Sequence, residues 1–120
     1  MSDFRDLQFY RKAFENAMAI FELTKDFPLE ERYALTTQIR KSARAVCANI
    51  AEAYRKRQFV KHFSAKISDA DMENSETIVW LDFSMACGYL HKELYVEMVS
   101  RVQEVGRMLH YAIAHPEKFQ

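Results

Sequence analysis

Residues 59–88 read FVKHFSAKISDADMENSETIVWLDFSMACG. In this stretch, residues of one row, all apolar except Asn74, recur every three or four positions. The row is Phe59, Phe63, Ile67, Ala70, Asn74, Ile78, Leu81 and Met85. Such spacing places one face of an α-helix toward a core. The stretch therefore predicts a long amphipathic helix that ends at Gly88, a residue suited to a helix C-terminus.

Three further segments show the same spacing. Residues 4–25 predict a first helix with its core face at Leu7, Tyr10, Phe14, Ala17, Phe21 and Thr24. A second helix is predicted from Leu29 to Arg57, after Pro28, with its core row at Leu35, Ile39, Val46, Ile50 and Ala53. A fourth is predicted from His91 to His115, with its row at Leu94, Met98, Val102, Val105, Leu109 and Ala112.

The composition supports long helices over strands. The 120 residues are 49% hydrophobic but include only two Gly and two Pro, too few for the turns of a sheet. Helices joined by short connectors pack as antiparallel neighbours. We expect an all-α protein, an antiparallel up-down-up-down four-helix bundle formed as a single domain by residues 1–120.

Some apolar residues lie outside these rows, namely Val79, Trp80, Phe83, Tyr95 and Val99. Two interpretations remain open: they cover an oligomer interface, or they fill a thick core.

Charge, cysteines and the first residues bear on location. The net charge is zero, and no apolar run approaches the roughly 20 residues of a membrane-spanning helix. The N-terminal MSDFRDLQFYRK lacks the apolar segment of a signal peptide. Cys47 and Cys87 sit in apolar helical patterns and are expected to be buried free thiols. The prediction is a cytoplasmic protein without a membrane partner.

Enzymatic motifs are missing from the sequence. There is no Glu-x-x-His pair, Cys-x-x-Cys pair or glycine-rich phosphate loop. The histidines, His62, His91, His110 and His115, are scattered and predicted to be surface or capping residues. Asp69, Glu73 and Glu76 have helical spacing that could chelate a hard cation, but a solvated or interface acidic face is favoured. We expect no catalytic residue, metal, cofactor or small-molecule substrate.

Charge is unevenly distributed along the chain. Residues 38–66 contain one acid, Glu52, and eight basic residues: Arg40, Lys41, Arg44, Arg55, Lys56, Arg57, Lys61 and Lys66. On a helix, Arg40, Arg44 and Arg55 fall within roughly 60° of one another. A basic stripe without a shaped pocket is typical of phosphate-backbone binding. The hypothesised nucleic-acid site is Arg40, Lys41, Arg44, Arg55, Lys56, Arg57 and Lys61.

A competing interpretation of these cations is a subunit contact. Residues 67–90 hold five acids and no Lys or Arg. The basic stripe of one copy could then pair with Asp69, Asp71, Glu73 or Glu76 of a neighbour. This alternative makes the protein an interaction or structural oligomer with no nucleic-acid binding.

Several blocks resemble a bacterial four-helix-bundle family known from ribosomal RNA intervening sequences. They are Asp6-Leu7, Lys12-Ala13, Phe27-Pro28, Leu35-Thr36, Gln38-Ile39-Arg40-Lys41, Asn49-Ile50-Ala51-Glu52, Gly88-Tyr89-Leu90 and Gly106-Arg107-Met108-Leu109. The resemblance spans nearly the whole chain, and the Asn49–Glu52 block is its most specific part.

The resemblance implies a four-helix protomer in a ring-shaped homopentamer, similar in fold to the accessory protein of diversity-generating retroelements, without enzymatic activity. It also implies a preference for RNA over DNA. Arg40, Lys41, Asn49 and Glu52 match the family motif, and for Asn49 and Glu52 a structural role is favoured over ligand contact. The chain departs from the family at Arg44, Ala53 and Ile67-Ser68.

Overall fold

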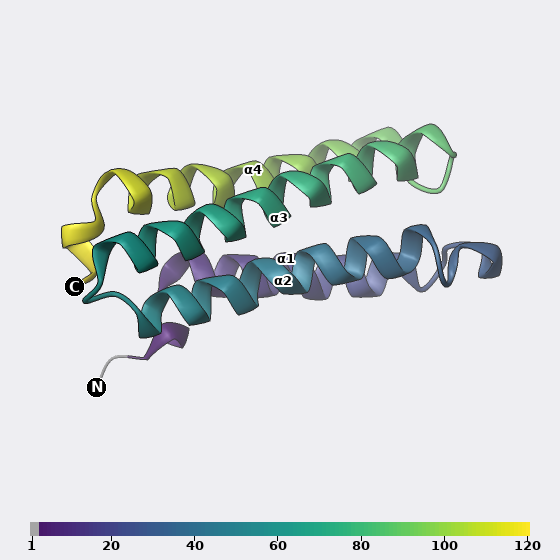
Figure 1. Ribbon diagram of the computed structural model, residues 1–120. Helices are drawn as coiled ribbons and strands as arrows, with labels where there is room; N and C mark the ends of the chain where they lie inside the picture. Colours follow the sequence, from purple (N-terminus) through teal and green to yellow (C-terminus); the bar gives the residue numbers. More distant parts are fainter. Residues whose placement is uncertain (1–2) are drawn as a thin grey trace.

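The computed structural model describes residues 3–120 and contains four α-helices. They are α1 (Gln8–Thr24), α2 (Leu35–Arg55), α3 (Val60–Ala86) and α4 (Lys92–Ala114). Three short 3₁₀ helices, η1 (Phe4–Asp6), η2 (Leu29–Glu31) and η3 (Pro116–Phe119), flank them. Consecutive helices run in opposite directions and form the predicted four-helix bundle (Figure 1). Its principal extents are 44 × 24 × 24 Å.

The core consists of two apolar clusters stacked along the bundle. One lies near the α2–α3 turn and includes Ile50, Phe63 and Leu109. The other lies toward the opposite end and includes Ile39 and Leu81. The predicted core rows are confirmed for α2 and, apart from the half-buried Leu94, for α4.

The predicted core face of α1 is correct at Thr24 but displaced by one residue over the rest of the helix. The buried row is Phe9, Ala13, Asn16, Ile20 and Thr24. Phe14, placed in the core by its spacing, is 50% exposed. Because successive helical residues are about 100° apart, the predicted row lies along the flank of the buried one. Tyr10, Ala17 and Phe21 of that row are half-buried, and Phe14 leaves aromatic surface uncovered on the outer side of α1.

Polar side chains take core positions where hydrogen bonds satisfy them. Asn16 Nδ2 donates to the Arg101 carbonyl of α4 at 3.1 Å, and its Oδ1 accepts from Arg101 Nε at 3.2 Å. Ser42 and Thr77 hydroxyls are bonded across α2 and α3 at 2.8 Å. Burial costs such groups little once they are paired. A polar residue can therefore occupy the core face, which apolar spacing alone does not reveal.

The second helix begins later than predicted. Pro28 starts the short η2 turn, and the α-helical path restarts only at Leu35. The Glu31 carboxylate lies between η2 and α2. It accepts hydrogen bonds from the Leu35 N–H at 3.3 Å and from the Tyr89 hydroxyl at 2.8 Å. This bond to Glu31 raises the pKa of Tyr89 to about 12. The break brings η2 against the turn between α3 and α4.

The predicted row of α3 is correct except at three positions. Phe59 precedes the helix and is 58% exposed. Ile78 and Met85 are half-buried, while Thr77 and Ser84 are buried in the core. Both of these hydroxyls donate to carbonyls one turn earlier, which satisfies them inside the core.

The expected stop at Gly88 is confirmed, and it depends on the glycine backbone. Gly88 has φ of +81°, its N–H donates to the Met85 carbonyl, and the Tyr89 N–H donates to the Ser84 carbonyl. This is the Schellman pattern, in which a side chain at the left-handed position is strained.

We expect Gly88→Ala to lower the free energy of unfolding by about 1–2 kcal/mol. A Cβ built at Gly88 meets nothing within 4 Å, so the cost arises from backbone strain and not from a clash. Urea denaturation of both proteins at equal concentration measures it. Gly88→Asn is the matched control, since Asn tolerates this conformation better. An alanine variant as stable as the parent would contradict the interpretation.

The two cysteines differ in environment. Both are free, but Cys87 is exposed at the end of α3, so the predicted burial is wrong there. Cys47 is half-buried on α2, and burial raises the pKa of its thiol to about 11.

Within residues 3–120, no helix is both long and apolar enough to cross a membrane.

Candidate nucleic-acid interface

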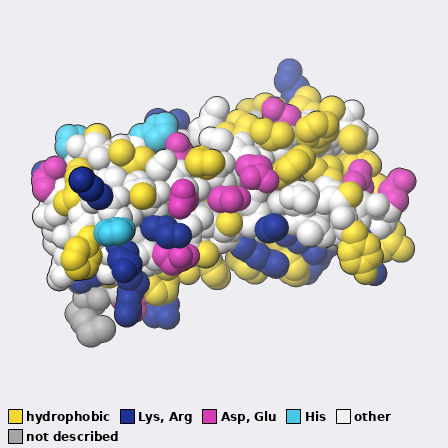
Figure 2. Space-filling view, in the orientation of Figure 1, with side chains coloured by type: hydrophobic (Ala, Val, Ile, Leu, Met, Phe, Trp, Pro, Cys, Tyr) yellow, Lys and Arg dark blue, Asp and Glu magenta, His cyan; other side chains and the backbone are white. Residues whose placement is uncertain are grey.

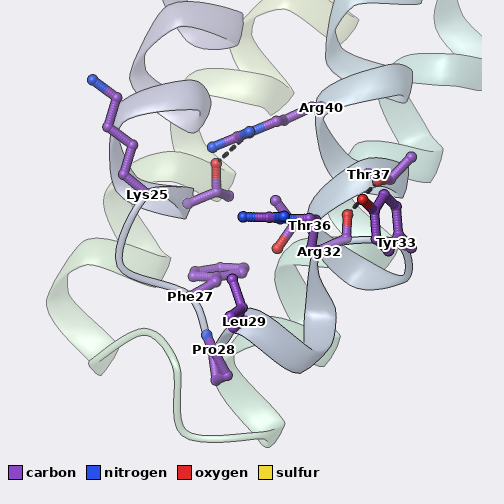
Figure 3. A pocket seen from close by; sticks show the side chains of 10 residues that line it. Lys25, Phe27, Pro28, Leu29, Arg32, Tyr33, Thr36, Thr37 and Arg40 are labelled. Carbon is purple, nitrogen blue, oxygen red and sulfur yellow. Dashed lines mark hydrogen bonds between the residues drawn. The ribbon is translucent and has the colours of Figure 1, made fainter.

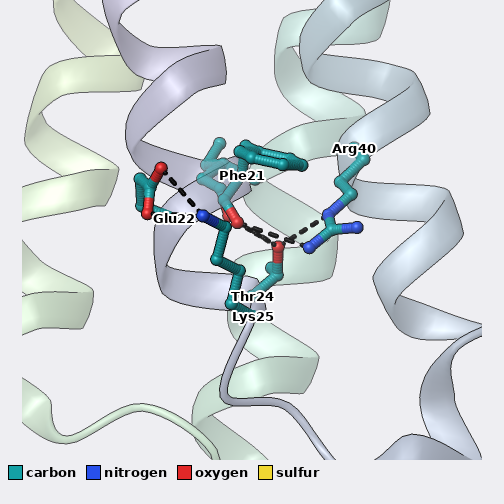
Figure 4. Close-up of polar contacts among 6 residues, drawn as sticks. Phe21, Glu22, Thr24, Lys25 and Arg40 are labelled. Atoms are coloured by element: carbon teal, nitrogen blue, oxygen red, sulfur yellow. Dashed lines mark hydrogen bonds and ion pairs between the residues drawn. The ribbon is translucent and has the colours of Figure 1, made fainter.

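Arg40 is the most constrained of the seven predicted cations. Its Nε donates to Thr24 Oγ1 at 2.8 Å and its Nη2 to the Phe21 carbonyl at 3.3 Å. The guanidinium also lies 4.7 Å from the Phe21 ring centroid. Figure 4 shows this half-buried side chain reaching from α2 to the last turn of α1. Arg40 therefore binds the free carbonyl end of α1, where a positive charge is favourable.

The next two cations of α2 diverge. Arg44 is exposed and lies over the same Phe21 ring, at 5.8 Å. Lys41 is turned toward α3, where its charge acts on Glu73. The pKa of Glu73 is raised by burial and by the charge of Glu76, against the opposing charge of Lys41. Arg40, Arg44 and Lys41 thus do not form one uniform binding strip.

The other predicted cations lie at or beside the connection between α2 and α3: Arg55 ends α2, Lys56 and Arg57 follow it, and Lys61 is in the first turn of α3. Arg55, Lys56 and Lys61 are exposed, and none forms an ion pair with an acid within the described chain. We call these three cations the basic turn. Arg57 is folded back: its Nη1 donates to the Tyr54 carbonyl at 3.0 Å and its guanidinium lies 4.2 Å from the Tyr54 ring centroid.

Phe59 is an exposed aromatic residue beside the basic turn that sequence spacing placed in the core. Its N–H donates to the Lys56 carbonyl at 2.8 Å, and its ring packs edge-on against His62 at 6.2 Å. An aromatic ring among cations offers a face on which a nucleobase can stack. The signal in the sequence was its position inside a run of basic residues.

Three of the four α3 acids named for a subunit contact, all except Glu73, have side-chain partners within the described chain. Asp69 lies 3.9 Å from Lys66, and Asp71 Oδ2 lies 2.9 Å from His110 Nε2. Glu76 accepts from Trp80 Nε1 at 3.2 Å. In Figure 2, Asp and Glu side chains lie across the middle of the visible face. Apolar surface over α3 and α4 is at the upper right, and Lys and Arg side chains lie lower on the same face.

Asn49 and Glu52, the motif residues, serve the helices. Asn49 Nδ2 donates to the Ala45 carbonyl of its own helix at 3.0 Å. Glu52 pairs with Lys66 of α3 at 3.1 Å. Both contacts fit the structural role that the sequence favoured for them.

Histidines and acids do not gather around one point in residues 3–120. No group of three or more His, Cys, Asp or Glu side chains in that range is placed to hold a metal ion. His91 caps α4 by accepting from the Leu94 N–H at 3.4 Å, and His115 follows its last residue. All four histidines are exposed, as predicted.

Most of this four-helix chain matches one known protein family. The model of the family described as 23S rRNA-intervening sequence protein matches residues 5–111. This chain belongs to that family. The matched residues include all seven cations of the nucleic-acid site predicted for this intervening sequence protein.

A solved structure agrees with the assignment. It is the 1.70 Å crystal structure of a protein with unknown function from the S23 ribosomal protein family of Bacteroides thetaiotaomicron VPI-5482. That protein is 28% identical to this intervening sequence protein, with a TM-score of 0.80. The alignment covers 88% of this chain and 95% of the other. A comparison with curated proteins finds no match.

Proposed function

We propose that this intervening sequence protein is a non-enzymatic, cytoplasmic homopentamer that binds RNA through the phosphate backbone. The observation that carries the RNA part is the basic turn, three exposed cations that have no acidic partner within residues 3–120, beside the exposed Phe59. Exposed cations bind phosphates by releasing counterions and need no base recognition. The name of the family, which refers to 23S rRNA, supports RNA as the nucleic acid and the cytoplasm as the location.

The assembly part rests on uncovered apolar surface. A groove of about 330 Å³ on the outer side of α1 and α2 is lined by Phe4, Tyr10, Phe14, Ala17, Met18, Arg44, Cys47, Ala48 and Ala51. On α3, Met72, Val79 and Phe83 are 68%, 44% and 54% exposed and share one face. Two different apolar patches on one chain favour a head-to-tail contact, which forms a ring when the rotation between successive copies closes. The number five comes from the family resemblance alone.

A specific observation also supports the second candidate, a structural oligomer without RNA. Arg44 borders the groove, while Glu76 lies on the α3 face that carries Met72 and Val79. These opposite charges would meet if the α3 face of one copy filled the groove of the next. In that arrangement Arg44 belongs to the subunit contact, and RNA binding depends on the basic turn.

A salt series separates the two functions. We expect a labelled single-stranded RNA to bind. The logarithm of its association constant should fall linearly with the logarithm of the salt concentration, with a slope of about −0.7 for each phosphate contacted. Light scattering on the same samples counts the subunits. An oligomer that fails to bind RNA at low salt would leave only the structural candidate, and a monomer would remove the assembly part.

A further inference from the structure

The end of the bundle opposite the basic turn contains a pocket that the RNA surface described above does not include. It lies between the C-terminus of α1 and the start of α2 and has a volume of about 500 Å³. Its lining residues are Thr24, Lys25, Phe27, Pro28, Leu29, Arg32, Tyr33, Thr36, Thr37 and Arg40. We call it the end pocket. Its size falls within the range of small-ligand sites.

Two guanidinium groups converge in the end pocket. Figure 3 shows Arg32 and Arg40 both directed from the α2 side toward the end of α1. The bonds to Thr24 and Phe21 fix the orientation of Arg40 but use only two of its five N–H donors. Arg32 forms no ion pair within the described residues. Paired guanidinium donors are the groups that recognise phosphate oxygens best.

None of the nearby acids lines the pocket, and two of them have partners elsewhere. Glu22 pairs with Lys25 at 3.1 Å on the rim. Glu31 is engaged by the Leu35 N–H and the Tyr89 hydroxyl, on the side that faces the α3–α4 turn. The nearly buried Thr36, 8% exposed, also lines the pocket, and its hydroxyl has no hydrogen bond within residues 3–120. The pocket lining therefore offers a donor hydroxyl and three cations, Lys25, Arg32 and Arg40, with no acid among the lining residues. The exposed Asp26 and Glu30 flank it in the sequence.

An aromatic ring completes the arrangement. Tyr33 lines the pocket and is 87% exposed, so the core gains almost nothing from its ring. The Arg32 guanidinium lies 6.0 Å from the Tyr33 ring centroid, which brings the ring close to the phosphate donors. Exposed aromatic rings next to cations are stacking platforms for nucleobases.

We infer that the end pocket binds one nucleotide unit of RNA, with its phosphate on Arg32 and Arg40 and its base on Tyr33. The identity of the ligand as RNA rests on the proposed function, but the pocket itself is independent of the basic turn. A nucleoside 5′-phosphate, free or at the end of an RNA, contains the same groups.

The test is a titration of the whole protein with adenosine 5′-monophosphate, in which NMR measures the chemical shifts of the backbone amides. We expect shifts confined to residues 24–40, and binding of adenosine without phosphate at least about tenfold weaker. Arg32→Gln should weaken nucleotide binding roughly tenfold or more, and Tyr33→Ala about fivefold or more. Arg107→Gln, at an exposed arginine of α4, is the control and should change nothing. Equal affinity of Arg32→Gln and the parent, or shifts elsewhere, would overturn the inference.

Short RNAs with and without a 5′ phosphate identify the source of the nucleotide. Tighter binding of the phosphorylated RNA, lost in Arg32→Gln, assigns the pocket to an RNA end. Equal binding of both RNAs, weakened alike by Arg32→Gln, assigns it to an internal nucleotide. If Arg32→Gln loses binding of the mononucleotide but binds both RNAs as the parent does, the pocket is assigned to a free nucleotide. If Arg32→Gln changes neither ligand while RNA still binds, the pocket inference fails and the proposed function stands.

Discussion

Replacing Arg55, Lys56 and Lys61 together with glutamate should weaken RNA binding at least about a hundredfold at low salt. The variant loses three cations per protomer and gains three charges that repel phosphate. The slope of the logarithm of affinity against the logarithm of salt should also fall, by about 2 if each cation contacts one phosphate of a single strand. Fluorescence anisotropy over a salt series measures both quantities. All three positions are exposed, so the bundle should fold unchanged.

A matched control separates local contact from net charge. Lys92, Arg107 and Lys118 are also exposed cations without acidic partners in the described chain, and they lie on or after α4. Reversing these three alters the net charge by the same amount. We expect the control to bind RNA within a few-fold of the parent. An equal loss in both variants would mean that only the overall charge matters, and a smaller oligomer in the first variant would place the basic turn in a subunit contact.

The α-helical pattern was predictable because burial repeats every three to four residues, but the choice between neighbouring faces of α1 was not. The row through Phe14 is more apolar than the row through Asn16, yet Asn16 is the buried residue. Its amide is satisfied by Arg101 of α4, a partner 85 residues away. A contact of this kind exists only once the helices are packed. Phe14 then remains exposed and, with the half-buried Tyr10 and Ala17, lines the groove that we assign to assembly.

The candidate site was predictable to the extent that it depends on charge density. A run with eight cations and one acid predicted a basic surface, and Arg55, Lys56 and Lys61 are exposed without acidic partners in residues 3–120. Their binding of nucleic acid stays a prediction. The run could not predict that Arg40 would bind carbonyls of α1, because that partner comes from a different helix. It also missed Arg32 and Tyr33, which lie in the segment between η2 and the start of α2 at Leu35.

Two phenylalanines one helical turn apart should differ sharply when each is replaced with alanine. Phe63 is 1% exposed in the apolar cluster near the α2–α3 turn, with its ring centroid 5.8 Å from that of Phe119. Its removal leaves a cavity, so Phe63→Ala should lower the free energy of unfolding by about 3–5 kcal/mol. Phe59→Ala should change it by no more than about 0.5 kcal/mol, because the ring is largely in solvent. Chemical denaturation at equal protein concentration makes the comparison, since assembly also contributes to stability.

The same pair tests why an apolar side chain stands at Phe59. If its ring stacks on a base, Phe59→Ala should weaken RNA binding about fivefold or more while stability is unchanged. A large loss of stability in Phe59→Ala would instead mean that a second copy covers the ring, because within one chain it is 58% exposed. Unchanged stability and unchanged RNA affinity would remove Phe59 from the interface and leave binding there to Arg55, Lys56 and Lys61 alone.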